Sequence, residues 1–164
     1  MGLDDDIAIL SAAPLFGFLG RDALRLLSFA AERRSLIPGV RLFARDERSD
    51  GGFVVMSGTI ALAPRFPGPG VEPVTVGRSG LIGRLALFLR GERPCDAHAV
   101  TSAEVIRITP TLMRRVLEEF PDAAQAIHAE LSDDLSVLAH DLDEVRARFD
   151  RITAPTPRDG QAPR

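Results

Sequence analysis

Disulfides, basic clusters and membrane-spanning runs are all missing from this sequence. Its 164 residues include one cysteine, Cys95, so the chain cannot form an internal disulfide. Lysine is absent, and the arginines are spread along the chain without a basic block, so the electrostatic footprint of a duplex DNA binder is missing. No apolar stretch is long enough to cross a bilayer, and the N-terminal residues 1–6 are acidic where a secretory signal would be basic and then apolar. We therefore predict a cytoplasmic protein with no membrane partner and no direct DNA binding.

Catalytic and metal-binding patterns are also missing. His98, His128 and His140 are too scattered along the chain for a metal site. No Ser-His-Asp arrangement and no pair of catalytic carboxylates stands out. The sequence predicts neither an enzyme nor a resident metal or cofactor, although its length is enough to bury a substantial core without disulfides.

The N-terminal region has helical periodicity. Residues 4–12 and 21–31 carry apolar side chains at helical spacing, and Pro14 and the glycines between 17 and 20 interrupt them. We predict two short helices around a turn. In the second helix the apolar positions are Leu24, Leu27 and Phe29.

The central region reads as short strands separated by turns. Runs rich in Val and Ile, bounded by Pro and Gly, occupy residues 40–43, 53–56, 60–63, 71–76 and 97–108. Close spacing of short strands predicts an antiparallel barrel or jelly roll, extending over about residues 33–108. The predicted fold class is α+β, a double-stranded β-helix flanked by N-terminal helices and a long C-terminal helix.

One segment carries most of the functional information. Ile82-Gly83-Arg84-Leu85-Ala86-Leu87 is followed, after a short loop, by Glu92-Arg93-Pro94-Cys95-Asp96-Ala97. We call residues 82–97 the cassette. A glycine that opens a short apolar helix, with an arginine several residues later, brings backbone N–H groups and a guanidinium to one small anion.

The cassette resembles that of the cyclic nucleotide-binding domain family, which includes catabolite-activator-type regulators and the regulatory subunits of cyclic-AMP-dependent kinases. The family pattern reads roughly Phe-Gly-Glu-x-Ala-Leu, a short loop and Arg-x-Ala-x-Val, and Gly83, Ala86, Leu87 and Arg93 fall on matching positions. The resemblance covers roughly residues 10–125. It implies a regulatory domain over residues 1–125 that binds cyclic AMP or cyclic GMP. The implied ligand-binding residues are Gly83, Arg84, Leu85, Ala86, Arg93, Pro94 and Cys95.

One cassette position departs from the family. Arg84 stands where the family has a Glu that accepts a hydrogen bond from the ribose 2′-hydroxyl. Arg84 is either exposed and idle, or paired with Glu92 or Asp96, or a second positive charge for a more anionic ligand. An ion pair between Arg84 and Asp96 would close the site electrostatically.

Three further cassette residues leave alternatives open. Gly83 with Arg93 forms either an anion cradle or a mere turn with a surface arginine. Cys95 is either a redox or nucleophilic group or, with no activating base in sight, a small residue in a tight loop.

The C-terminal region is predicted to be helical. Thr109-Pro110 has the form of an N-cap and first helical residue for a helix to Glu119, and Pro121 restarts a helix over 122–153. The apolar residues of this second helix recur at alternating steps of four and three, which is a heptad pattern that we call the seam. The seam predicts a homodimer, in which Asp141 and Arg146 could pair across the interface. The alternative is that the seam packs on the β-roll of its own chain. The seam consists of Leu131, Leu135, Leu138, Leu142, Val145, Phe149 and Ile152. Residues 154–164 are predicted to be a disordered tail.

Three functions remain open. The first is a sensor of a cyclic nucleotide, with weak or altered binding, that signals through the C-terminal helix. The second is a ligand-independent dimeric module that docks a protein partner. The third is a relative of transcription regulators that acts through a partner, because only a short tail follows where such relatives carry a helix-turn-helix domain.

Overall fold

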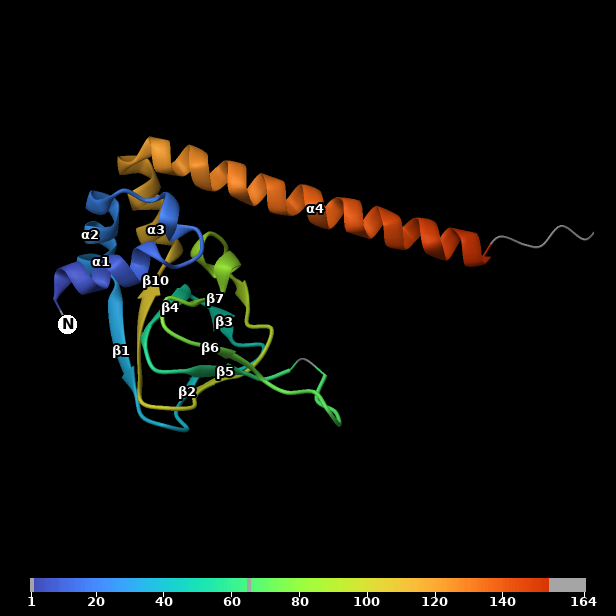
Figure 1. Cartoon of the computed structure of the whole chain (residues 1–164), viewed down its shortest axis with the longest axis horizontal. Helices are drawn as coiled ribbons and strands as arrows, with labels where there is room; N and C mark the ends of the chain where they lie inside the picture. Colours follow the sequence, from blue (N-terminus) through green and yellow to red (C-terminus); the bar gives the residue numbers. More distant parts are fainter. Residues whose placement is uncertain (1, 65, 154–164) are drawn as a thin grey trace, which may run out of the picture. The chain divides into compact units, whose positions relative to one another are not determined.

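The computed structural model describes residues 2–64 and 66–153, and the predicted tail at 154–164 lies outside them. The chain divides into two compact units, Met1–Ile127 and His128–Arg164. The first contains helices and an antiparallel jelly roll, and the second contains most of the long helix α4 (Figure 1).

The jelly roll consists of two four-stranded antiparallel sheets and one short strand pair. The first sheet has the order β1-β10-β4-β7, the second has the order β2-β9-β5-β6, and β3 pairs with β8. The strand bounds are β1 Glu32–Leu36, β2 Arg41–Phe43, β3 Arg48–Ser49, β4 Gly52–Ser57, β5 Ile60–Leu62, β6 Val74–Val76, β7 Leu81–Ile82, β8 Gly91–Glu92, β9 Ala97–Ala99 and β10 Ala103–Ile108.

The core of the roll lies between the two large sheets. Phe43, Phe53, Val55, Ile60 and Val105 belong to this buried cluster, and each is at most 5% exposed. The central strand β4 is buried on both faces, because the helices cover its other side. Burial on both faces explains why this strand reads as a continuous apolar run rather than an alternating one.

The N-terminal helices confirm the sequence prediction with one exception. Helix α1 spans Leu3–Ser11, a 3₁₀ turn η1 spans Phe16–Phe18, and α2 spans Arg21–Ala30. Leu24 and Leu27 are buried, but Phe29 is 71% exposed. Phe29 follows Leu27 by only two residues, which at 100° per residue places it off the buried face.

Two strand predictions need correction. The predicted strand over 97–108 is two strands in different sheets, β9 and β10, separated by residues 100–102. The strand predicted from Val71 begins only at Val74. Strand β1 was not predicted as a strand, because its Glu-Arg-Arg-Ser-Leu sequence has little apolar content. The two-residue strands β3, β7 and β8 are too short to show a periodicity.

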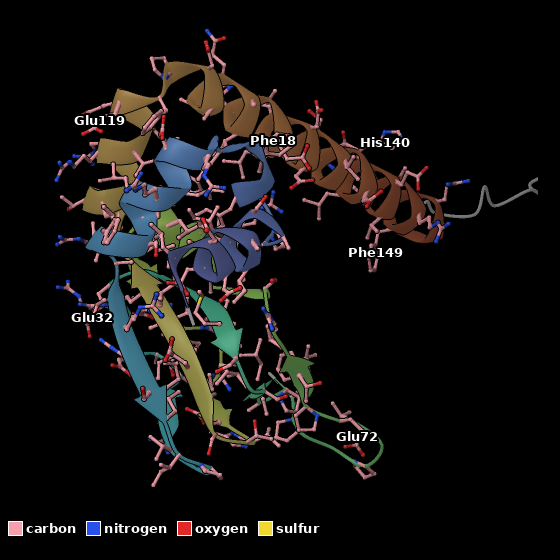
Figure 2. All side chains as sticks on the ribbon, turned by 60° about the vertical axis from the view of Figure 1, so that its left-hand side comes forward. Phe18, Glu32, Glu72, Glu119, His140 and Phe149 are labelled. Carbon is pink, nitrogen blue, oxygen red and sulfur yellow. The ribbon has the colours of Figure 1, made fainter. Side chains whose placement is uncertain are left out.

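The C-terminal helices follow the predicted boundaries. Helix α3 spans Pro110–Glu119, with Thr109 as its N-cap accepting a hydrogen bond from the Leu112 N–H at 3.2 Å. Helix α4 spans Pro121–Thr153. On this helix Phe149 and His140 project from opposite sides (Figure 2), as their spacing of nine residues requires at 100° per residue.

The turn between β4 and β5 requires a glycine at position 58. Gly58 has φ +79°, and a Cβ there would lie 2.2 Å from the Ser102 carbonyl oxygen. We expect Gly58→Ala to lower the free energy of unfolding by about 2 to 5 kcal/mol, through backbone strain and a clash that only backbone movement relieves.

Gly39 provides the matched control for this change. Its φ is +85°, but nothing lies within 4 Å of a Cβ built there, so Gly39→Ala should cost only the left-handed strain of about 1 to 2 kcal/mol. Urea denaturation of both variants measures the two losses in the free energy of unfolding. Equal losses of stability would show that the close approach to Ser102 contributes nothing.

Candidate functional site

The cassette begins with a backbone conformation that favours glycine. Gly83 follows β7 with φ +75° and caps the 3₁₀ helix η2, Arg84–Leu87. The Ala86 N–H donates to the Gly83 carbonyl at 3.0 Å. A Cβ at position 83 would lie 2.9 Å from Nη1 of Arg93, so this glycine also allows the guanidinium to approach the backbone.

Arg93 is buried beneath this turn. It is 3% exposed, and its guanidinium carbon lies 4.4 Å from the ring centroid of Phe43 and 5.2 Å from that of Phe53. Nη2 donates to the Gly51 carbonyl at 2.7 Å. The reading of this position as a surface arginine is therefore wrong, because the structure brings Gly83 and Arg93 together in the interior.

The buried guanidinium is only partly satisfied. Its Nε is buried and has no hydrogen-bond partner within residues 2–64 and 66–153. Burial lowers the pKa of Arg93, while the carboxylates of Asp50 and Glu47 act in the opposite direction. An arginine nevertheless stays charged at neutral pH, so Arg93 places a positive charge within the roll.

Asp50 is the counter-ion of this charge. Its Oδ1 lies 3.5 Å from Nη2 of Arg93, and its Oδ2 pairs with Nη1 of Arg107 on β10. Arg107 also pairs with Glu32 on β1. Asp50 gives no signal in the sequence beyond its place before Gly51 and Gly52, because its partners lie far away along the chain.

A cavity of about 470 Å³ opens beside the turn. We call it the cassette cavity. Six of the seven predicted site residues line it: Gly83, Arg84, Leu85, Ala86, Arg93 and Pro94. Its volume lies within the range of about 300 to 1,000 Å³ that is typical of small-molecule sites.

Five residues that line the same cavity were not predicted as site residues: Ser49, Leu89, Arg90, Gly91 and Glu92. Four of these lie in the loop and short strand between Gly83 and Arg93, so their position within the cassette could have identified them as site residues. Ser49 comes from β3 and gave no signal in the sequence.

Cys95 and Asp96 lie outside the cavity lining. Cys95 is half-buried against the core of the roll, and burial is the main cause that raises the pKa of its thiol. A raised pKa lowers the thiolate fraction, which argues against a reactive nucleophile. The Asp96 carboxylate accepts a hydrogen bond from the Arg45 backbone N–H at 2.7 Å. Asp96 therefore stabilises a neighbouring turn.

Metal clusters and membrane-spanning helices are missing from residues 2–64 and 66–153. No cluster of three or more His, Cys, Asp or Glu residues is placed to hold a metal ion. No helix in this part of the chain has the length and apolar character needed to cross a membrane.

Comparison with known proteins decides the family. The model of the cyclic nucleotide-binding domain matches residues 33–120, which is more than half of the chain. The chain belongs to this family. No curated protein matches it.

Solved structures of cyclic nucleotide-binding-like and regulatory proteins share this fold. A cyclic nucleotide-binding-like protein from Brucella abortus is 37% identical, with 70% of this chain and 99% of that chain covered and a TM-score of 0.61. The N-terminal domain of a transcriptional regulator from Streptomyces coelicolor is 26% identical, covering 79% and 94%, with a TM-score of 0.69. The sensor domain of the transcriptional regulator DNR from Pseudomonas aeruginosa is 18% identical, covering 94% and 97%, with a TM-score of 0.66, and supports the fold alone.

Proposed function

We propose that this member of the cyclic nucleotide-binding domain family is a non-enzymatic sensor that binds cyclic AMP or cyclic GMP weakly or in an altered way. The observation that carries the proposal is the position of Arg93, whose guanidinium lies against Gly83 in the wall of the cassette cavity. Backbone N–H groups and a guanidinium at one point are suited to a single phosphate group.

The incomplete bonding of Arg93 supports an anionic ligand. A buried donor without a partner costs about 1 to 3 kcal/mol, so the arginine gains from any acceptor that reaches it. The Nε of Arg93 is such a donor. A ligand phosphate has to compete with Asp50 and the Gly51 carbonyl for the same guanidinium, which lowers the net gain.

Arg84 supports altered recognition. This residue lines the cavity where the family has a glutamate that accepts from the ribose hydroxyl. Loss of one charged hydrogen bond removes about 1.5 to 3 kcal/mol, which is roughly one to two decades of affinity. We therefore expect native affinity for cyclic AMP to be well below that of a cassette with the glutamate.

The signalling part of the proposal rests on α4. Leu135, Leu142, Val145 and Phe149 belong to the heptad seam, and they are 66%, 67%, 47% and 65% exposed. Large apolar side chains that repeat along one exposed stripe favour an interface with a second copy of the chain. In this proposal the homodimer transmits ligand occupancy.

The alternative is a ligand-independent dimeric module, or a transcription-regulator relative that acts through a partner. The internal partners of Arg93 favour the module, because they hold the phosphate-binding arginine without any ligand. Calorimetric titration of the purified chain with cyclic AMP and cyclic GMP decides between them. Saturable heat supports the sensor, and its absence at millimolar ligand supports the module.

Arg93→Met separates the binding role of this residue from a structural one. Methionine fits the apolar space between Phe43 and Phe53, and Asp50 keeps its pair with Arg107. The Asp50 side chain is 58% exposed and keeps Arg107, so loss of the Arg93 charge leaves no buried carboxylate unpaired, and we expect the free energy of unfolding to stay within about 1 kcal/mol. Cyclic nucleotide binding should fall at least tenfold. A loss of about 3 kcal/mol or more in urea denaturation would instead assign Arg93 to the fold.

A further inference from the structure

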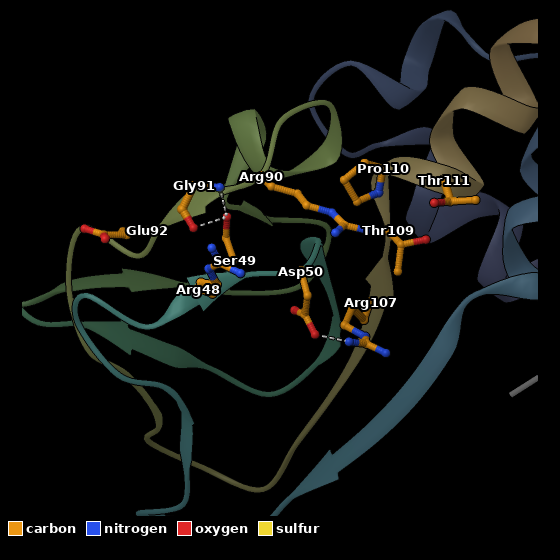
Figure 3. Close-up of a pocket in the computed structure, with 10 residues that line it drawn as sticks. All are labelled: Arg48, Ser49, Asp50, Arg90, Gly91, Glu92, Arg107, Thr109, Pro110 and Thr111. Carbon is orange, nitrogen blue, oxygen red and sulfur yellow. Dashed lines mark hydrogen bonds and ion pairs between the residues drawn. The ribbon is translucent and has the colours of Figure 1, made fainter.

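A second cavity, of about 670 Å³, lies where β3 and β8 meet the end of β10 and the start of α3 (Figure 3). We call it the arginine cavity. Its polar lining includes Arg48, Arg90, Arg107, Asp50, Thr109 and Thr111. It shares one wall with the cassette cavity, but Arg48, Arg107 and both threonines line only the arginine cavity.

The positive charge of this cavity is not fully compensated. Arg107 is matched by Asp50 and Glu32. In the part of the chain that the structure describes, Arg48 and Arg90 form no ion pair. The Glu92 side chain points away from the other residues drawn, whereas the Arg90 side chain extends toward Thr109 (Figure 3). Two unpaired guanidinium groups in a concave surface attract anions.

The arrangement of donors indicates which anion fits. Arg48 comes from β3, Arg90 from the residue before β8, and Thr109 and Thr111 from the start of α3. The Thr109 oxygen accepts from the Leu112 N–H, so its hydroxyl hydrogen is left to donate. A planar carboxylate presents two oxygens to one guanidinium, whereas a phosphate presents oxygens in several directions. Donors on separate walls of the cavity therefore favour a phosphate.

We propose that the arginine cavity is a second anion site, which takes a compact phosphate-bearing anion with two or more negative charges. Arg48 and Arg90 bind phosphate oxygens from two walls, and the threonine hydroxyls donate from a third. Its volume leaves room for two linked phosphates. This site does not depend on cyclic nucleotide binding in the cassette cavity.

Titration of the full chain with pyrophosphate at constant ionic strength tests the proposal. We expect saturable binding, with weaker binding of inorganic phosphate and sulfate. Arg48→Gln should lower the association constant for pyrophosphate at least tenfold, and the double variant Arg48→Gln with Arg90→Gln should abolish saturable heat.

Two controls locate the binding. Arg78→Gln removes an exposed arginine that lines neither cavity, and it should leave the association constant within twofold. Arg84→Glu alters only the cassette cavity, and it should also leave pyrophosphate binding unchanged. The proposal is overturned by an absence of saturable binding, by equal losses in the Arg48 and Arg78 variants, or by a loss with Arg84→Glu alone, which would place the anion in the cassette.

Discussion

Replacing Arg84 with glutamate is expected to raise the affinity for cyclic AMP at least tenfold. The change restores a charged acceptor for the ribose 2′-hydroxyl in the wall of the cassette cavity, and it leaves Gly83 and Arg93 in place. One charged hydrogen bond accounts for the gain. Calorimetric titration of both proteins measures it.

The matched control for this experiment is Arg78→Glu, which makes the same charge change at an exposed position outside both cavities. It should not change the affinity for cyclic AMP. Since Asp96 is held by the Arg45 backbone, adding Asp96→Thr to the Arg84 variant should bring no further gain. Low-micromolar binding by the native protein, with no improvement in the variant, would show that another group satisfies the hydroxyl, and Glu92 would be the first candidate.

Leu142→Asp is expected to convert a dimer into monomers. Leu142 occupies an a position of the heptad seam and is 67% exposed in the single chain. In a parallel two-stranded interface each copy would bury an unpaired carboxylate, which is strongly unfavourable. Sedimentation velocity at about tens of micromolar, where dimers of such helices are populated, measures the change.

Val137→Asp is the control for this substitution. Val137 is 62% exposed and lies on the same helix, but at a c position outside the seam. This variant should stay dimeric, and both variants should keep the β-sheet signal of the jelly roll in circular dichroism. A native chain that sediments as a monomer at this concentration would exclude the seam as an interface.

Local signals predicted the elements around the site. The left-handed backbone at position 83 favours glycine, and Thr109 followed by Pro110 caps α3, so both turns can be predicted from a few neighbouring residues. The same holds for the restart of the helix at Pro121. A continuous apolar run located β4, because its buried side chains are contiguous. Apolar content could not divide residues 97–108, where β9 and β10 have similar composition and join different sheets.

The sequence by itself determined the N-terminal and C-terminal helices, the cassette and the charge change at Arg84, because each depends on residues close together in the chain. The tertiary structure alone decided that Arg93 is buried, that Asp50 is its counter-ion from 43 residues away, and that Cys95 and Asp96 lie outside the cavity. These outcomes depend on strand pairing, which places Glu32 opposite Arg107 and Arg48 opposite Glu92. Contacts between distant residues leave no periodic signal in the sequence, so only the folded chain brings these charges together.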